Sequence, residues 1–199
     1  MEESVIYNGH LVNETGIRPT EDKLEAVRKA PTTKSTTELR SYLGLINYYG
    51  KFMPNLSSVL APLNDLLKKG AKWTWKKKQE EAFKRTKVML ESVGILVHYN
   101  PALKLIVKGD ASPYGLGAVL TQVMEDGSQQ PILFASCTLT AAEKNYSQLD
   151  REVLAVVFAV KKFHLYSCGR HFRLETDHKL LLGLFGEGKA IFLGLSLLE

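Results

Sequence analysis

Three acidic residues, Asp110, Glu152 and Asp177, stand where their side chains could share one chemical task. Asp110 follows a run of alternating apolar residues and precedes small, turn-forming residues, so it ends a predicted strand. Asp177 ends another predicted strand, and Glu152 lies in a predicted long helix between them. Ligand sites in α/β sheets lie at the carboxyl ends of the strands. The sequence therefore predicts that the three carboxylates converge at one edge of a sheet.

Carboxylates that crowd together repel one another unless a hard cation compensates their charge. Mg²⁺ is such a cation, and it prefers oxygen ligands. Two ions about 4 Å apart, bridged by carboxylates, activate water and stabilise the leaving oxygen in phosphodiester cleavage. We therefore predict a magnesium site formed by Asp110, Glu152 and Asp177 and suited to phosphodiester hydrolysis.

Each of these acids also has a purely structural interpretation. Asp110 stands in a turn context, where aspartate is common. Glu152 would be an edge residue of its helix that pairs with Lys104 or Lys108. Asp177 would cap the helix that is predicted to follow it. The metal-site interpretation depends on the three acids being delivered together rather than on any one of them.

The elements that would position the acids follow an α/β pattern. Period-two apolar runs and turn residues predict strands over residues 103–108, 116–124, 131–137 and 171–176. A long helix is predicted over residues 147–166 and a short one over 179–185. The predicted buried stripe of the long helix comprises Leu149, Val153, Val156, Val160 and Phe163, with Glu152 at its edge. Hairpin-linked strands followed by a helix and a further strand indicate a mixed sheet.

Residues 20–93 instead show helical periodicity with clear start and stop signals. Four helices are predicted, with these caps or first residues: Thr20, Ser35, Ser58 and Lys77. Pro62 falls in the first turn of the third helix, where proline is tolerated. Before the helices, Asn8-Gly9 predicts a two-residue hairpin within residues 4–12, with no nearby segment to extend its sheet. The expected fold class is therefore mixed, α+β or α/β, with a small helical unit followed by a sheet with helices.

A basic segment that contains two tryptophans leads into the fourth predicted helix. The residues predicted to contact nucleic acid are Lys72, Trp73, Lys76, Lys77 and Lys78. Lysines would neutralise phosphates, and tryptophan would stack on bases. The alternative is a solvated helix face with Trp73 and Trp75 as anchors in the core. The net charge of +5 favours a polyanionic partner.

Composition limits the class of protein and its cellular setting. Two cysteines, far apart in the chain, indicate neither a disulfide framework nor a zinc knuckle. No apolar run reaches the length of about 18 residues that a membrane span needs, and the N-terminus lacks a signal-peptide pattern. We expect an intracellular protein of the cytoplasm or nucleus that is neither secreted nor bound to a membrane.

Several motifs carry a resemblance to a known family. Asp110-Ala111-Ser112, Arg151-Glu152-Val153-Leu154-Ala155 and Thr176-Asp177-His178-Lys179 resemble the first three acid motifs of ribonuclease H. Residues 39–49 with Phe52-Met53-Pro54-Asn55 resemble a reverse transcriptase thumb and connection, and residues 5–12 with 16–19 resemble the last palm hairpin. Nearly the whole chain thus resembles the reverse transcriptase–ribonuclease H region of Pol polyproteins from gypsy-class LTR retrotransposons.

This resemblance implies four segments: a remnant palm hairpin (1–19), a helical thumb and connection (20–96), an incomplete ribonuclease H-like domain (97–186) and an atypical tail (187–199). It also implies that Asp110, Glu152 and Asp177 are catalytic metal ligands for Mg²⁺ or Mn²⁺, with an RNA–DNA hybrid as substrate. The paired aspartates of the polymerase palm are missing, so DNA synthesis is not expected. No aspartate follows Asp177 to supply the fourth acid of the family.

Three functions compete on this basis. The first is a ribonuclease that hydrolyses the RNA strand of RNA–DNA hybrids with two metal ions. The second is a retroelement remnant without activity that binds nucleic acid through its basic segment. The third is an actin-like ATPase, which shares the opening strand, acid and turn, but the later phosphate-binding loops of such a fold are missing.

Overall fold

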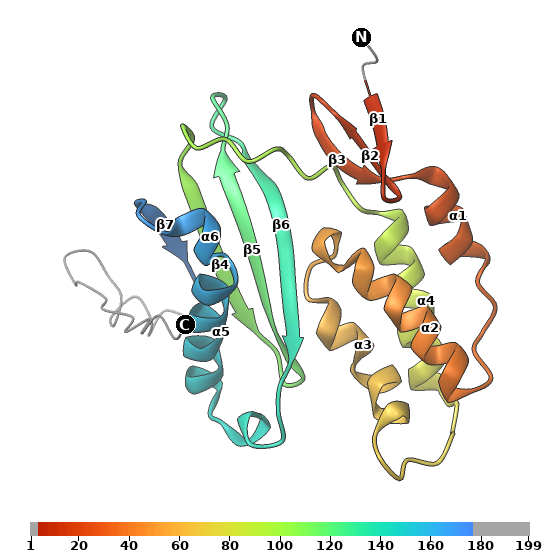
Figure 1. The fold of residues 1–199 in the computed structure, drawn as a ribbon. Coiled ribbons are helices and arrows are strands. Elements are labelled where there is room, and N and C mark those ends of the chain that lie inside the picture. Colours follow the sequence, from red (N-terminus) through yellow and green to blue (C-terminus); the bar gives the residue numbers. More distant parts are fainter. Residues whose placement is uncertain (1–3, 177–199) are drawn as a thin grey trace.

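The computed structural model describes residues 4–176. Its elements form a small N-terminal sheet, a group of four α-helices and a second, larger sheet with its own helix (Figure 1). The predicted short helix over residues 179–185, the tail and Asp177 lie outside the described residues. Within residues 4–176, no helix is both long enough and apolar enough to cross a membrane.

The N-terminal sheet consists of β1 (Ser4–Tyr7), β2 (His10–Asn13) and β3 (Gly16–Pro19), all antiparallel. The predicted Asn8-Gly9 turn is confirmed, because both residues have positive φ, 48° and 72°. The prediction that nothing nearby extends this sheet was wrong, since β3 adds a third strand. Ile17 in β3 also exchanges backbone hydrogen bonds of 2.8 and 3.0 Å with Leu96, which ties the sheet to the chain that leaves the helices.

The helical unit, as we call α1 to α4, follows the predicted periodicity. Its helices are α1 (Glu21–Lys29), α2 (Thr36–Tyr48), α3 (Leu56–Asn64) and α4 (Lys77–Glu91), with short 3₁₀ turns at Gly50–Phe52 and Asp65–Leu67. Ser35 caps α2 as predicted, accepting a hydrogen bond from the Glu38 N–H at 3.2 Å. The predicted start of α3 was wrong: the helix begins two residues before Ser58, so Pro62 lies inside it rather than in its first turn.

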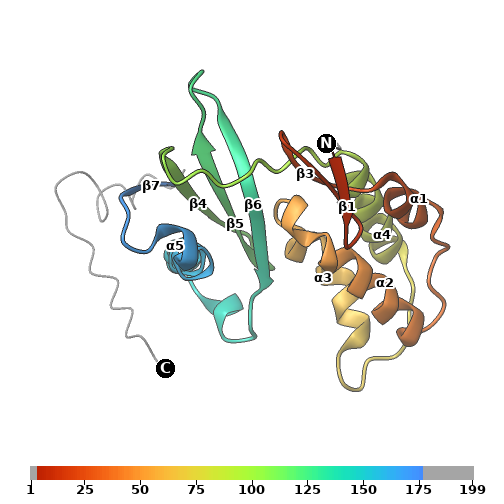
Figure 2. The same ribbon diagram turned by 45° about the horizontal axis from the view of Figure 1, so that its top comes forward.

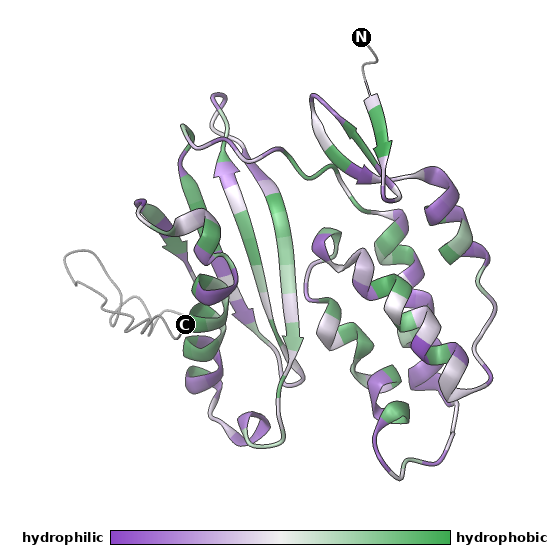
Figure 3. Cartoon of the chain, in the orientation of Figure 1, coloured by the Kyte–Doolittle hydropathy of each residue, from purple (hydrophilic) through white to green (hydrophobic). Residues whose placement is uncertain are grey.

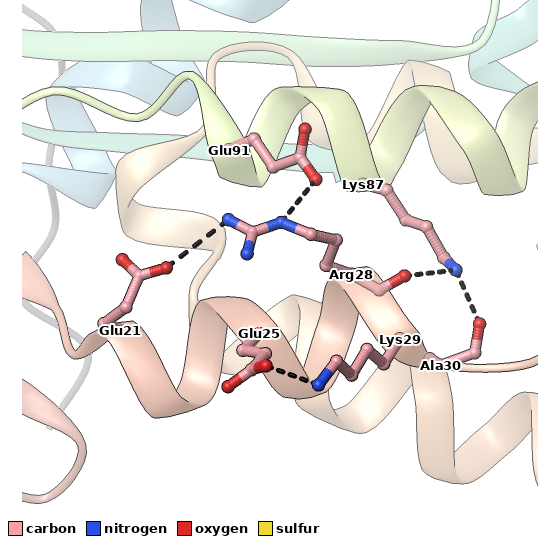
Figure 4. A network of polar contacts seen from close by, with 7 residues as sticks. All are labelled: Glu21, Glu25, Arg28, Lys29, Ala30, Lys87 and Glu91. Carbon is pink, nitrogen blue, oxygen red and sulfur yellow. Dashed lines mark hydrogen bonds and ion pairs between the residues drawn. The ribbon is translucent and has the colours of Figure 1, made fainter.

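Charged and polar contacts hold α1 against α4 (Figure 4). Lys87 donates to the carbonyl oxygens of Arg28 and Ala30, at 3.0 and 2.5 Å, at the end of α1. Arg28 in turn pairs with Glu91 at 3.1 Å and with Glu21 at 3.4 Å. Carbonyls in the last turn of a helix lack partners within the helix, so a lysine that reaches them satisfies groups that would otherwise face water.

The larger sheet has the strand order β6-β5-β4-β7. Its strands are β4 (Leu105–Ala111), β5 (Gly115–Val123), β6 (Gln129–Thr138) and β7 (Phe172–Glu175). The β4–β7 pair is parallel and the other pairs are antiparallel, which confirms the predicted mixed sheet. Between β6 and β7 the chain forms a 3₁₀ turn (Glu143–Asn145), α5 (Gln148–Lys162) and α6 (His164–Ser167).

The larger sheet lies between two helical layers. In two views, α5 covers one face and the helical unit stands beside the other, nearest β6 (Figures 1 and 2). Hydrophobic residues concentrate along β5, β6 and α5, whereas α1 is largely hydrophilic (Figure 3). Ile106, predicted to face outward, is only 1% exposed, because its central strand is covered on both faces. The alternation of apolar and polar residues therefore identified the strand but not the burial of its second face.

The predicted buried stripe of the long helix was wrong in its orientation. The residues of α5 that are buried are Glu152, Ala155, Val156, Ala159 and Val160. Gly109 in β4 explains the difference, because a Cβ there would lie 2.8 Å from the carbonyl oxygen of Ala155. The missing side chain lets the helix backbone approach β4, and the small alanines therefore face the sheet. Glu152 consequently lies within the buried stripe rather than at its edge.

Candidate functional site

Asp110 lies near the carboxyl end of β4, directly opposite Gly117 of β5. Its carboxylate is exposed, and Oδ2 accepts a hydrogen bond from Asn55 Nδ2 at 3.0 Å. A shallow cavity of about 210 Å³ opens beside it. The cavity is lined by Pro54, Asn55, Lys108, Gly109, Asp110, Gly117, Ala118, Val119 and Phe134. Asp110 is thus an accessible carboxylate at a strand end rather than a residue that closes its own turn.

Glu152 is a buried carboxylate in the first half of α5, with 5% of its surface exposed. Its Oε1 accepts a hydrogen bond of 2.5 Å from Gln148 Nε2, one turn earlier in the helix. Gln148 Oε1 in turn accepts from Arg151 at 2.9 Å, so the amide is fixed from both sides. Burying a carboxylate is costly unless donors or cations compensate its charge. Glu152 is therefore held in one orientation by its own helix.

The packing of α5 on β4 brings Glu152 toward the end of the strand that carries Asp110. The first half of the strand, at Leu105 and Val107, shares a hydrophobic cluster with Ala159 and Phe163. The last strand residue, Ala111, packs instead into a separate cluster with Ala155. The helix therefore runs antiparallel to β4. Glu152, about one turn before Ala155, lies over the carboxyl end of the strand.

The two acids approach that end from different sides. Gly109 faces α5, so Asp110, the next residue, faces the side of the sheet that the helical unit covers. Lys108 shares the face of Asp110 and forms an ion pair of 2.7 Å with Glu175 of β7. This pair corresponds to the parallel register of β4 and β7. The structure therefore assigns Lys108 to Glu175, and not to Glu152 as one structural interpretation proposed.

The third acid, Asp177, lies outside the described residues, two positions beyond Glu175 in the sequence. Among residues 4–176, no three His, Cys, Asp or Glu side chains gather in a way that could hold a metal ion. Two of the three predicted ligands are thus brought to one end of β4, and the placement of the third stays a prediction.

The basic segment lies before and at the start of α4, far along the chain from the acids. Lys72, Lys76 and Lys78 are exposed and form no ion pair with any described residue, whereas Lys77 lies 3.8 Å from Glu81. The segment therefore offers positive charge that is not neutralised by the protein itself. Its nucleic-acid contacts stay a prediction.

The tryptophans of this segment have a structural role in the helical unit. Trp73 stacks on Trp75 with ring centroids 5.9 Å apart, and both pack against the core. The Trp75 indole N–H donates to Glu80 at 2.9 Å, and this hydrogen bond lowers the pKa of the Glu80 carboxyl. Trp75 is therefore an anchor of the core, and the partly buried Trp73 covers it.

Sequence reasoning missed one residue of the candidate site, Asn55. It contacts Asp110 across the interface between the helical unit and the sheet, which no local pattern predicts. A signal for close approach was nevertheless present, because Gly115 and Gly117 alternate on one face of β5. Glycine inside a strand often marks a position where another backbone or side chain comes close.

Comparison with known proteins gives matches over most of the chain. The family described as "RNase H-like domain found in reverse transcriptase" matches residues 75–174. The Transposon Tf2-3 and Tf2-4 polyproteins of Schizosaccharomyces pombe are 35% identical over 181 residues, which is 90% of this chain. The chain spans only 14% of the length of these curated relatives.

Solved structures of similar fold come from the foamy viral protease-reverse transcriptase. One is a complex with RNA/DNA hybrid, with a TM-score of 0.74, 24% identity and coverage of 96% of this chain and 26% of that one. Another is a complex with dsDNA, with a TM-score of 0.76, 23% identity and coverage of 96% and 41%. At these identities the likeness is one of fold.

Proposed function

The chain belongs to the family of RNase H-like domains found in reverse transcriptase, as part of a retrotransposon polyprotein, and on this basis we propose that it is a divalent-metal-dependent nuclease acting on the RNA strand of RNA–DNA hybrids. The observation that carries the proposal is the packing of α5 on Gly109. It brings the buried carboxylate of Glu152 over the strand end that presents Asp110. Perturbed or buried acids at such an edge are candidates for catalysis.

The donor set at this edge fits a hard divalent cation. Asp110 and Glu152 supply only carboxylate oxygens, which are the ligands that Mg²⁺ and Mn²⁺ favour. In the proposal, Asp177 completes the set from the chain beyond β7. When bound, the metal would supply Lewis-acid stabilisation of the charge that develops in phosphodiester hydrolysis. Gln148 keeps Glu152 oriented, and the exposed position of Asp110 leaves room for a phosphate beside it.

The proposed partner is nucleic acid, bound through the basic segment. The similar solved structures are complexes with RNA/DNA hybrid and with dsDNA, which supports a duplex as the ligand of this fold. Lys72, Lys76 and Lys78 are the described lysines of the segment that no acid neutralises, and Trp73 and Lys77 lie among them. This observation also favours the second candidate function, an inactive chain that binds nucleic acid through the same residues.

Cleavage of a labelled hybrid in Mg²⁺ or Mn²⁺ tests the nuclease. Asp110→Asn and Glu152→Gln keep the size of each side chain and remove its charge, so each should lower the rate by about 100-fold or more. Asp126→Asn is the matched control, because Asp126 lies in the β5–β6 turn and bonds only to Ser128 nearby. Binding without cleavage would favour the inactive binder. Cleavage that Asp110→Asn leaves undiminished would rule out the nuclease proposal for this site.

A further inference from the structure

The helical unit meets the larger sheet through the first turn of α3. Ser58 and Ser112 share a hydrogen bond of 2.7 Å between their Oγ atoms, and the Ser57 N–H donates to Ser136 Oγ at 3.0 Å. A Cβ at Gly115 would lie 2.4 Å from Ser57 Oγ, so the approach depends on glycine. We call these contacts, together with that of Asn55 below, the α3–sheet contact.

Asn55 occupies the same contact at its edge nearest the candidate site. Its amide donates from Nδ2 to Asp110 Oδ2 at 3.0 Å. The other amide atom, Oδ1, lies where a Cβ at Gly117 would be, only 1.6 Å from that position. Because Gly117 is the strand partner of Asp110, the amide rests on one strand while it bonds the next. The side chain is therefore held against the sheet from below and by the carboxylate at its end.

The position of Asn55 in its own helix points to the same role. Asn55 is the N-cap of α3, yet its side chain makes no capping hydrogen bond. Asparagine at an N-cap ordinarily accepts from an N–H of the first turn. Here φ is +50°, in the left-handed region that asparagine tolerates, and the amide is turned toward Asp110. The usual function of an N-cap residue is given up for a contact between the helical unit and the acid.

We propose that Asn55 is a positioning residue that makes the orientation of the Asp110 carboxylate depend on the docking of the helical unit. This inference rests on the proposed function, in which Asp110 holds a divalent cation. A donor on Oδ2 fixes the rotamer of the carboxylate and leaves Oδ1 for the cation. Loss of the α3–sheet contact would free the side chain, and the nuclease site would then be assembled only when the two parts of the chain are docked.

A double-mutant cycle tests the coupling without any metal. The full chain carries Asn55→Ala, Asp110→Ala or both, and the unfolding equilibrium constant of each is measured in urea. Directly contacting groups are expected to be coupled, and here the coupling factor should be about threefold or more. A coupling factor indistinguishable from one overturns the proposal, whether or not the chain binds metal.

Mn²⁺ binding, followed by the electron paramagnetic resonance signal of free Mn²⁺, tests the positioning role. Asn55→Ala should weaken Mn²⁺ binding by about tenfold, as expected for a residue that orients a ligand. Ser58→Ala is the matched control, because it removes a hydrogen bond of the same contact without touching Asp110. Its Mn²⁺ affinity should stay that of the unmodified chain.

The outcomes separate the two proposals. If the unmodified chain and Asp110→Ala bind Mn²⁺ equally, the proposed function fails at this site, and the cycle alone then decides the coupling of Asn55. If the chain binds Mn²⁺ but Asn55→Ala leaves the affinity unchanged, or if Ser58→Ala weakens it as much, Asn55 has only a structural role and the proposal is wrong.

Discussion

Replacing Gly109 by alanine perturbs the one contact that sets the height of α5 above β4. The added Cβ would lie 2.8 and 2.9 Å from the carbonyl oxygen and carbon of Ala155, and 3.1 Å from the backbone nitrogen of Val156. All three atoms belong to the backbone of the helix, so no flexible side chain can move aside. The helix itself must shift away from the strand.

The expected cost follows from this geometry. Forcing one extra carbon into a packed interface typically costs about 1–3 kcal/mol. The shift would also move Glu152, because it lies one turn from Ala155 on the same rigid helix. Gly109→Ala should therefore lower the free energy of unfolding by about 1–3 kcal/mol. It should also lower any hybrid cleavage by more than the loss of folded protein explains.

Urea unfolding followed by far-ultraviolet circular dichroism measures the effect. Gly44→Ala is a control of opposite sign, because Gly44 is an exposed residue of α2 and a Cβ there meets nothing within 4 Å. Alanine in a helix interior is favoured over glycine by about 1 kcal/mol, so this variant should be more stable. If Gly109→Ala were as stable as the unmodified chain, the close approach would not limit α5, and the explanation for the burial of Glu152 would be wrong.

Three further predictions concern other parts of the chain. Burial, and to a lesser extent the charge of Lys51, lowers the pKa of His10 below its usual value of 6.5, so the folded protein binds this proton less readily than the unfolded chain. The stability that this histidine contributes should be complete above pH 6.5 and decline as the pH falls below it; His10→Phe should flatten that decline in unfolding measurements made from pH 7 to 5. Tyr42→Phe removes the buried 2.6 Å hydrogen bond to Thr86, and because Thr86 still donates to a backbone carbonyl, the loss in urea unfolding should be about 1 kcal/mol, whereas a loss near zero would contradict this assignment. Alanine at all three unpaired lysines should lower the slope of log affinity for hybrid against log salt by up to about 0.9 per phosphate contact, while Lys29→Ala, whose ammonium already pairs with a carboxylate, should leave the slope unchanged. The three lysines are Lys72, Lys76 and Lys78.

Much of the fold was predictable because it depends on local preferences. The Asn8-Gly9 turn follows from the positive φ that those residues adopt readily, and Ser35 caps α2 through a hydrogen bond three residues away. The stripe of α2 is buried as its period predicts. The order of strands and helix also placed Asp110 at a strand end and led to the family by resemblance.

Contacts between distant segments determined the rest. The apolar content of α5 favoured a stripe through Leu149 and Val153, yet the helix turns its alanines to the sheet, because Gly109 rewards the closest backbone approach. That rotation buries Glu152. Asn55 reaches Asp110 because α3 docks on glycines of β5, residues far from it in sequence. Residue types and spacing named the acids, and only the packing of α5 and α3 on the sheet decided how each carboxylate is held, since the fit of two surfaces depends on residues that no single segment contains.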